Sequence, residues 1–404
     1  MTIHTKWMEL LRKEATDAFQ YGTLTEAVNA SFIDGQIKLM ISVDPSQSWA
    51  DFIHSKFTSV IMRHFMEYGC STVILAFDDK RFVPKAKVIT QLKRRAGVNI
   101  IPFDQSDVLP NHLPLEWRES IMNPWFKHRV LELICANIPR LISPPKGSKL
   151  IVDWETVTEY TYGDEDQPSV SEIGQQDPVG EADLKFTRWM QALGCPMLIE
   201  ATDGDYIPIS FGLKVAGFEQ PVTILKAWNQ QRGFEFISIQ KLLSFVQNKF
   251  RDSLHKQKSP ECPWWEVKLF ITLLGLSGTD FTRNLPLVSP QKMWSALPLI
   301  TRTFAMETSC RIHELQGKRI VELLYAEAFP KHIDVFSRQS IWIQAQASKL
   351  GQRNKELIPT DARIMCTLRN INFLLSYWLE FRAPSNIESY GFRCHAEGRV
   401  EWDD

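Results

Sequence analysis

Two pairs of acidic residues stand close together in the middle of the chain, Glu181 with Asp183 and Asp203 with Asp205. The first pair opens a segment with apolar residues at helical spacing, which predicts a helix that ends at Gly194. The second pair follows a short apolar run that predicts a buried strand. Carboxylates that gather at a strand end repel one another unless cations screen them. A site for divalent metal ions is therefore the first hypothesis for this stretch.

Three further acids occupy the same kind of position, and they matter because a single D-x-D sequence after a strand is usually only a turn. Residues 37–43 alternate between apolar and polar types and end at Asp44. Helical spacing follows, and a second apolar run then ends at Asp78. This order predicts two parallel strands joined by a helix, with both acids at the carboxyl ends of the strands. The third acid, Asp280, follows a helix predicted over 265–274.

The segment from Lys80 to Arg95 contains seven basic residues and no acidic one. A solvated helix face is one explanation, although such faces usually carry both signs of charge. A run of one sign directly after an acidic strand end also suits the binding of phosphate groups. Lys87, Gln91 and Arg94 are spaced four and three residues apart, so in a helix they would share one face.

Composition limits the class of protein. The chain has 404 residues, of which 44% are hydrophobic and 23% charged, so it can bury a core as two ordinary domains or as one domain with large insertions. The net charge of −1 means that nucleic acid would have to bind at a local basic patch. The seven cysteines include no C-x-x-C pair, which argues against a zinc module or a disulfide framework. With a charged N-terminus and no long apolar run, we expect an intracellular protein of the nucleus or cytoplasm that contacts no membrane.

The remaining pattern predicts an α/β fold with a mainly parallel central sheet flanked by helices. Residues 149–152, 207–211 and 222–225 read as further strands, and 161–176 as an acidic loop. Beyond residue 290 the spacing is mostly helical. We therefore expect a catalytic domain over 1–290, with an insert at 80–148 that is basic at its start, and a helical region of unassigned role over 291–404.

Acids at five separate places in an α/β sheet suit a phosphodiesterase that uses two metal ions about 4 Å apart. Because Mg²⁺ keeps several of its waters, only some of the acids need to touch an ion. We expect Asp78, Glu181, Asp183 and Asp203 nearest the ions, with Asp44, Asp205 and Asp280 acting partly through bound water. The predicted catalytic residues are Asp44, Asp78, Glu181, Asp183, Asp203, Asp205 and Asp280, and all of them except Asp44 are predicted metal ligands.

The order of these motifs resembles the 5′-nuclease superfamily, a PIN-like group that includes flap endonucleases, XPG-type nucleases and 5′→3′ exoribonucleases. The resemblance covers roughly residues 1–300. It implies two Mg²⁺ ions, replaceable by Mn²⁺, and cleavage near a 5′-phosphorylated end of a single strand or flap. The matching motifs are Val43-Asp44, Ala76-Phe77-Asp78, Gly180-Glu181-Ala182-Asp183, Thr202-Asp203-Gly204-Asp205 and Gly278-Thr279-Asp280-Phe281.

Two segments are similar to the exoribonuclease branch of that superfamily. The sequence from Pro84 to Arg95 resembles that branch's P-[RK]-A-K-x-x-x-Q-x-x-R-R segment, and 278–286 resembles its G-N-D-F-x-P-x-L-P. The first similarity implies a pocket for the 5′-phosphate. The side chains expected to bind phosphate are Lys85, Lys87, Gln91, Lys93, Arg94 and Arg95.

Several departures leave the choice between DNA and RNA, and between exonuclease and endonuclease, open. Asp79 and Thr2 replace glycines of the family pattern, and both the G-I-G hairpin and a sliding-clamp box are missing. The chain is also far shorter than cellular exoribonucleases. We expect a compact, divergent, monomeric member, of the kind that a virus or another mobile genome encodes.

Two other functional classes are consistent with parts of the pattern. One is a nucleic-acid-binding protein that kept the fold and lost catalysis, which the acids present at all five places argue against. The other is a haloacid-dehalogenase-like phosphatase, which would need D-x-D-x-[TV] after the first strand. The chain has Asp44-Pro45-Ser46 there, so this class fits poorly.

Overall fold

The computed structural model describes residues 3–82, 84–87, 89, 92, 95–174, 180–229, 232–254, 261–282, 284–285, 288–303, 311–328, 361–381, 384–395 and 400–403. Its centre is a nine-stranded sheet with the order β1-β9-β8-β7-β2-β3-β4-β5-β6. The strands are β1 (Phe19–Tyr21), β2 (Ala30–Asp34), β3 (Thr72–Ala76), β4 (Lys149–Asp153), β5 (Val157–Thr161), β6 (Ser169–Ile173), β7 (Met197–Glu200), β8 (Val222–Asn229) and β9 (Gly233–Ser238). A separate hairpin pairs β10 (Phe392–Cys394) with β11 (Val400–Trp402).

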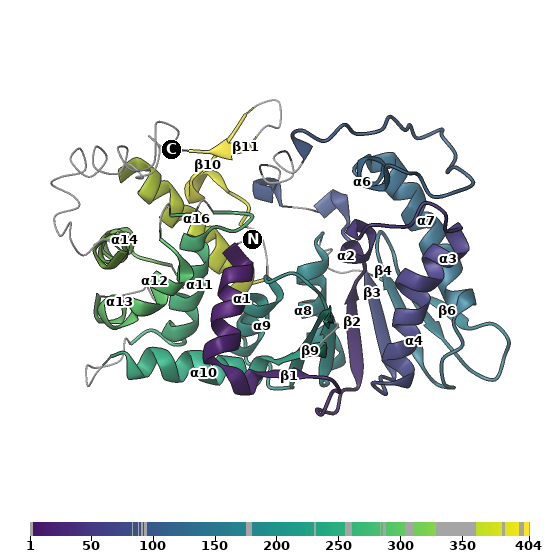
Figure 1. The fold of residues 1–404 in the computed structure, drawn as a ribbon, viewed down its shortest axis with the longest axis horizontal. Coiled ribbons are helices and arrows are strands. Elements are labelled where there is room, and N and C mark those ends of the chain that lie inside the picture. The colour runs from purple at the N-terminus through teal and green to yellow at the C-terminus, as the bar shows by residue number, and fades with distance from the viewer. Residues whose placement is uncertain are drawn as a thin grey trace.

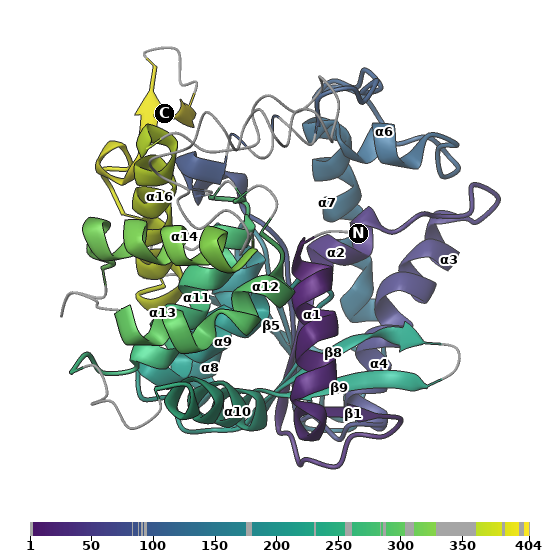
Figure 2. The same cartoon turned by 60° about the vertical axis from the view of Figure 1, so that its left-hand side comes forward.

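The middle of the sheet, β8-β7-β2-β3-β4, is parallel, and the strands at both edges pair antiparallel. Figure 2 shows β1 and the β8–β9 hairpin side by side at one edge. The predicted class, an α/β fold with a parallel sheet core and a helical C-terminal region, is confirmed.

Helices cover both faces of the sheet (Figure 1). The helices are α1 (Ile3–Glu14), α2 (Gly35–Met40), α3 (Trp49–Ile53), α4 (Ser59–Met66), α6 (Trp117–Ile121), α7 (Pro124–Leu141), α8 (Ala182–Leu193), α9 (Tyr206–Val215), α10 (Ile239–Asp252), α11 (Trp265–Ser277), α12 (Pro290–Ser295), α13 (Leu297–Thr303), α14 (Glu314–Ala328) and α16 (Asp361–Leu379). Short helical turns are η1 (Thr16–Ala18), η2 (His54–Thr58), η3 (Lys80–Phe82), η4 (Lys85–Lys87) and η6 (Glu388–Tyr390).

Alternate residues of the central strands enter two different cores. In β3, Val73 and Leu75 join the core under α3, α4, α6 and α7. Ile74 and Ala76 point to the other face and join the larger core under α1, α8–α14 and α16. Because both faces are buried, the strand is apolar throughout rather than alternating.

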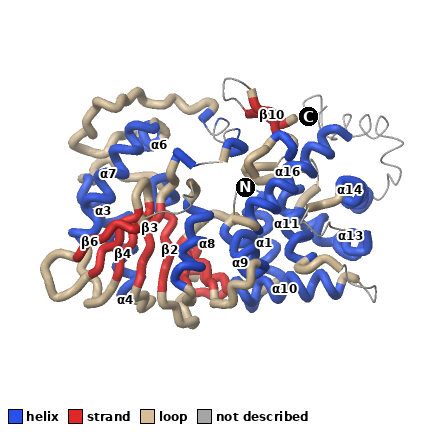
Figure 3. The backbone as a smooth tube through the Cα atoms, turned by 180° about the vertical axis from the view of Figure 1, so that it is seen from behind, coloured by secondary structure: helices blue, strands red, loops and turns tan. Residues whose placement is uncertain are grey.

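The C-terminal helices pack directly on the core of the sheet domain (Figure 3). Gly212 of α9 lies against the main-chain carbonyl of Trp378 in α16, so a side chain at residue 212 would collide with it. Gly275 of α11 approaches α16 in the same way. A Cβ at residue 275 would lie 2.8 Å from the Cγ1 atom of Ile371. These close approaches bring α16 up to the helices that follow the acidic motifs. Within the described residues, no helix has the length and apolar character needed to span a bilayer.

Two strand predictions are wrong. Residues 37–43 form the end of helix α2 and a loop, and the strand before them is β2, which ends at Asp34. Residues 207–211 lie inside helix α9. Both segments are short and apolar, and in such segments the period of the pattern does not separate a strand from a buried helix. The acidic stretch predicted as a loop contains β6 at 169–173.

Candidate active site

The carboxyl ends of the parallel strands carry acidic residues at one level of the sheet. Asp34 ends β2, and its register partner in β3 is Ala76, two residues before Asp78. Asp203 and Asp205 follow β7, which pairs with β2 on its other side. Parallel pairing therefore brings acids from three neighbouring strands to one edge.

Seven carboxylates form a single group, which we call the acid cluster. Each interacts electrostatically with at least one other member of the group. Burial, together with the neighbouring carboxylates, raises the pKa of Asp183 and of Asp205 well above the ordinary value. The members are Asp34, Asp78, Glu181, Asp183, Asp203, Asp205 and Asp280.

The start of helix α8 is fixed by the end of β3. The Asp78 carboxylate accepts a hydrogen bond from the main-chain N–H of Ala182 at 3.1 Å, and the Asp79 N–H donates to the Gly180 carbonyl at 2.6 Å. A carboxylate at a helix N-terminus is favoured by the free N–H groups there. This contact sets Glu181 and Asp183, which lie on either side of Ala182, beside Asp78.

Lys87 of η4 provides a positive charge inside the acid cluster. Its ammonium forms an ion pair with Glu181 and lies 3.9 Å from the Oδ2 atom of Asp280. Burial alone would lower the pKa of Lys87, but Glu181, Asp183 and the neighbouring acids raise it well above its usual value. Lys87 therefore stays protonated and partly neutralises the carboxylates around it.

Two buried tyrosines hold individual carboxylates of the cluster. The Tyr206 hydroxyl in α9 donates a hydrogen bond of 2.9 Å to Asp34 Oδ2. The Tyr377 hydroxyl in α16 donates to Glu181 Oε2. Burial and the approach of Asp78 raise the pKa of Asp34 to about 7, which the Tyr206 hydrogen bond opposes.

Two further lysines border the cluster. Lys226 in β8 donates hydrogen bonds to the carbonyls of Thr202 (2.9 Å) and Asp203 (2.7 Å), so it holds the loop after β7. Burial lowers the pKa of Lys226 to about 8. Lys127 in α7 interacts electrostatically with Asp78 and Asp34, and burial lowers its pKa. Neither lysine belongs to a motif that singles it out in the sequence.

Two other acids at the strand ends have partners that make them structural. Asp153 at the end of β4 forms ion pairs with Lys185 (2.8 Å) and Arg188 (2.5 Å), and it is fully buried. Asp79 pairs with Arg81 at 2.6 Å. Buried carboxylates that are already paired in this way gain little from a metal ion.

The prediction that Asp44 belongs to the site is contradicted by its position. Asp44 is exposed in the loop between α2 and α3. Its Oδ1 atom accepts hydrogen bonds from the N–H (2.9 Å) and the hydroxyl (2.7 Å) of Ser46, and these lower its pKa. Asp34 takes the strand-end place instead. The Asp34-Gly35 pair is the signal for it, because Gly35 lies against the Phe77 ring with no room for a side chain.

All the other predicted acids lie in the acid cluster. Of the predicted phosphate-binding residues, Lys87 lies in the cluster and Lys85 is exposed. Arg95 is exposed and is close enough to Lys127 to affect its pKa. Gln91, Lys93 and Arg94 lie outside the described residues.

The donor set has the chemistry that Mg²⁺ prefers, since every member of the acid cluster offers hard carboxylate oxygens. The Oδ1 atom of Asp183 is buried without a hydrogen-bond donor, as expected for an oxygen that a cation would satisfy. Among the described residues, no group of three or more histidine, cysteine, aspartate or glutamate side chains has the geometry to hold a metal ion. The cation that stands among the carboxylates here is the Lys87 ammonium.

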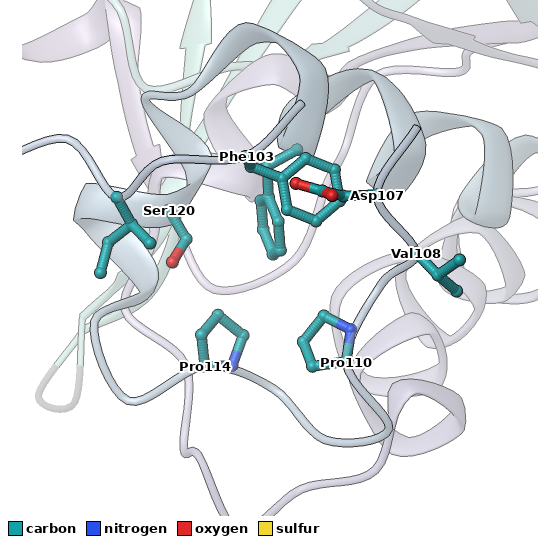
Figure 4. A pocket seen from close by; sticks show the side chains of 8 residues that line it. Phe103, Asp107, Val108, Pro110, Pro114 and Ser120 are labelled. Carbon is teal, nitrogen blue, oxygen red and sulfur yellow. The ribbon is translucent and has the colours of Figure 1, made fainter. Parts of the chain in front are cut away.

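A pocket of about 380 Å³ opens in the 80–148 insert, beside helices α6 and α7. Its walls are mainly apolar and include Phe103, Pro110 and Pro114. Figure 4 shows the Ser120 hydroxyl and the Asp107 carboxylate among these rings. None of the described residues that line the pocket is basic, so its chemistry differs from that of a phosphate site.

No protein-family model matches the chain, and no curated protein matches it in sequence. Solved structures with a similar fold include the following two, each of which aligns with most of the chain. The catalytic core of Rad2 in complex with a DNA substrate is 12% identical, with a TM-score of 0.42 over 93% of this chain and 86% of that one. The T5 D15 protein co-crystallised with metal ions is 13% identical, with a TM-score of 0.33 over 85% of this chain and 99% of that one.

Proposed function

We propose that the protein is a Mg²⁺-dependent nuclease that hydrolyses phosphodiester bonds near the 5′ end of nucleic acid. The observation that carries this proposal is the acid cluster. Its carboxylates come from five places: the end of β2, the segments after β3, β7 and α11, and the start of α8. They meet at one edge of a parallel sheet. A structural role would call for each buried acid to have a cationic partner, as Asp153 has. The cluster instead holds seven carboxylates with one ammonium, that of Lys87, among them and two further lysines, Lys127 and Lys226, at its border.

Asp78, Glu181, Asp183, Asp203, Asp205 and Asp280 would hold two Mg²⁺ ions, with Asp34 beside them. When bound, the ions would activate a water for attack and stabilise the departing oxygen. Few direct ligands are needed, because Mg²⁺ keeps several waters that the remaining carboxylates orient. Mn²⁺, which also prefers oxygen ligands, would replace Mg²⁺.

The chain's own residues would bind and orient the substrate. Lys87, whose ammonium lies within the acid cluster, would bind a phosphate oxygen there, and Lys127 of α7, which interacts electrostatically with Asp78 and Asp34, would bind a second one. Once the ions had bound the carboxylates, the ammonium groups of Lys87 and Lys127 would bind the substrate phosphate. The basic segment 80–95, which includes Lys87, would supply the charge for a 5′-phosphate.

The test is a cleavage assay with purified protein, with and without Mg²⁺. The substrates are single strands, flaps and duplexes of DNA and RNA, each with a 5′-phosphate or a 5′-hydroxyl. We expect hydrolysis that requires the ion and favours the 5′-phosphate. Binding of these substrates with no cleavage at any Mg²⁺ concentration would reject the enzyme and leave a nucleic-acid-binding protein on the same fold.

A further inference from the structure

We infer that Tyr377 is a positioning residue of the active site, so that helix α16 of the C-terminal region is part of the catalytic apparatus. This inference rests on the proposed function, because it concerns how Glu181 is prepared to bind a metal ion. Tyr377 does not touch the substrate or the ions; it acts through Glu181.

The contact between the two side chains is fully enclosed. Glu181 is 2% exposed and Tyr377 is 1% exposed, so water does not compete for the hydrogen bond between them. The Tyr377 hydroxyl occupies Oε2 of Glu181, while Lys87 pairs with Oε1. The neutral Tyr377 hydroxyl thereby fixes the orientation of the Glu181 carboxylate through Oε2. The other oxygen, Oε1, contacts the charged Lys87 ammonium.

The ring of Tyr377 is held as firmly as its hydroxyl. Its centroid lies 5.0 Å from that of Phe281 and 5.9 Å from that of Phe373, with the Phe373 ring nearly parallel at 17°. Phe281 directly follows Asp280 of the acid cluster. Tyr377 therefore connects the start of α8 with the loop after α11, and both carry predicted metal ligands.

A donor that holds a metal-binding carboxylate in one orientation increases the affinity of the site. It favours the ionised carboxylate at Oε2 and leaves the second oxygen to the ion. Glu181 is thereby held in one orientation before an ion binds. The close approach of α16 to α9 and α11, which Gly212 and Gly275 permit, brings Tyr377 within hydrogen-bond distance of Glu181.

The experiment measures Mn²⁺ and Mg²⁺ binding by calorimetry, without nucleic acid, for the wild type, Tyr377→Phe and Tyr325→Phe. The first variant removes only the hydroxyl and keeps the ring on Phe281 and Phe373. Tyr325 is a matched control, because it is equally buried, in α14. We expect ion affinity to fall by about tenfold or more in Tyr377→Phe, the lower end of what such partners contribute, and to stay unchanged in Tyr325→Phe.

A double-mutant cycle with Glu181→Gln separates positioning from general packing. If Tyr377 acts through Glu181, adding Tyr377→Phe to Glu181→Gln causes no further loss of ion affinity. Equal affinities in the wild type and Tyr377→Phe, or fully additive losses in the cycle, would overturn the inference. Failure of the proposed function looks different, because the wild type would then bind ions without cleaving any substrate.

Discussion

Lys87 and Glu181 form an ion pair inside the acid cluster, and the same ammonium lies 3.9 Å from Asp280. One positive charge thus stands among carboxylates from several elements. A divalent ion that bound Oε1 of Glu181 would compete with the Lys87 ammonium for that oxygen. Ion binding and the Lys87 contact therefore oppose each other.

Lys87→Met should separate ion binding from catalysis. Removing the competing ammonium should tighten Mg²⁺ binding in the absence of substrate, by several-fold or more, as read by calorimetry. Cleavage should nevertheless slow by about 10²-fold, the order that loss of one preorganised charged group costs. Lys85→Met is the control, since Lys85 lies in the same turn but is exposed. Unchanged ion affinity in Lys87→Met would refute the competition.

Asp183→Ala and Asp203→Ala should reduce hydrolysis by at least about 10²-fold without unfolding the protein. Each removes a carboxylate that other acids repel, so the metal-free fold should be as stable or more stable. Asp44→Ala is the matched control, because Asp44 is exposed and bonded only locally to Ser46 in the described contacts. Rates are measured under single-turnover conditions at saturating Mg²⁺. Wild-type rates in either cluster variant would contradict the site.

The stability of the metal-free protein should fall as pH rises. The pKa of Asp34 is raised from 3.8 to about 7, so the folded protein binds this proton more tightly than the unfolded chain does. The resulting stabilisation is complete below pH 3.8 and is lost as pH rises through about 7. Urea unfolding between about pH 5 and about pH 8.5 should show the decline, and Asp34→Asn should reduce it. Saturating Mg²⁺ should abolish the decline, because it stabilises the ionised carboxylates.

Asp153→Asn should lower the free energy of unfolding by about 3–5 kcal/mol, because it leaves buried Lys185 without its carboxylate. Asp153 also accepts a hydrogen bond from the Trp189 indole at 2.7 Å, which ties α8 to β4. Urea denaturation checks the value, and ion affinity is the second measurement. If Asp153→Asn lost Mg²⁺ binding without losing stability, Asp153 would be a metal ligand and not a structural residue.

Arg94→Ala should reduce cleavage of 5′-phosphorylated substrates far more than cleavage of 5′-hydroxyl ones. A pocket for the terminal phosphate contacts a group that carries more charge than an internal diester. A nonspecific backbone track would instead weaken binding of both substrates equally and lower the salt dependence, by about 0.7–0.9 in slope per lost contact. The ratio of the two rates at fixed ionic strength decides between them.

The sequence by itself determined the class of the fold and most members of the acid cluster. Apolar runs that end in acids, separated by helical spacing, predict parallel strands with carboxylates at one edge, and Asp78, Asp203 and Asp205 follow from that rule. Glu181 and Asp183 follow from the helix start that they mark. These patterns are local, and hydrophobic periodicity reports local structure well.

Only the tertiary structure decided which acids are available for chemistry. Asp34 ends a strand whose five residues are all buried, so no alternation marks it, while the alternating residues near Asp44 form a short helix and a loop. Asp153 ends a strand just as Asp34 does, yet Lys185 and Arg188 neutralise it from α8. Tyr377 reaches Glu181 from a helix far along the chain. Partners of this kind depend on packing between distant elements, and spacing along the chain carries no record of them.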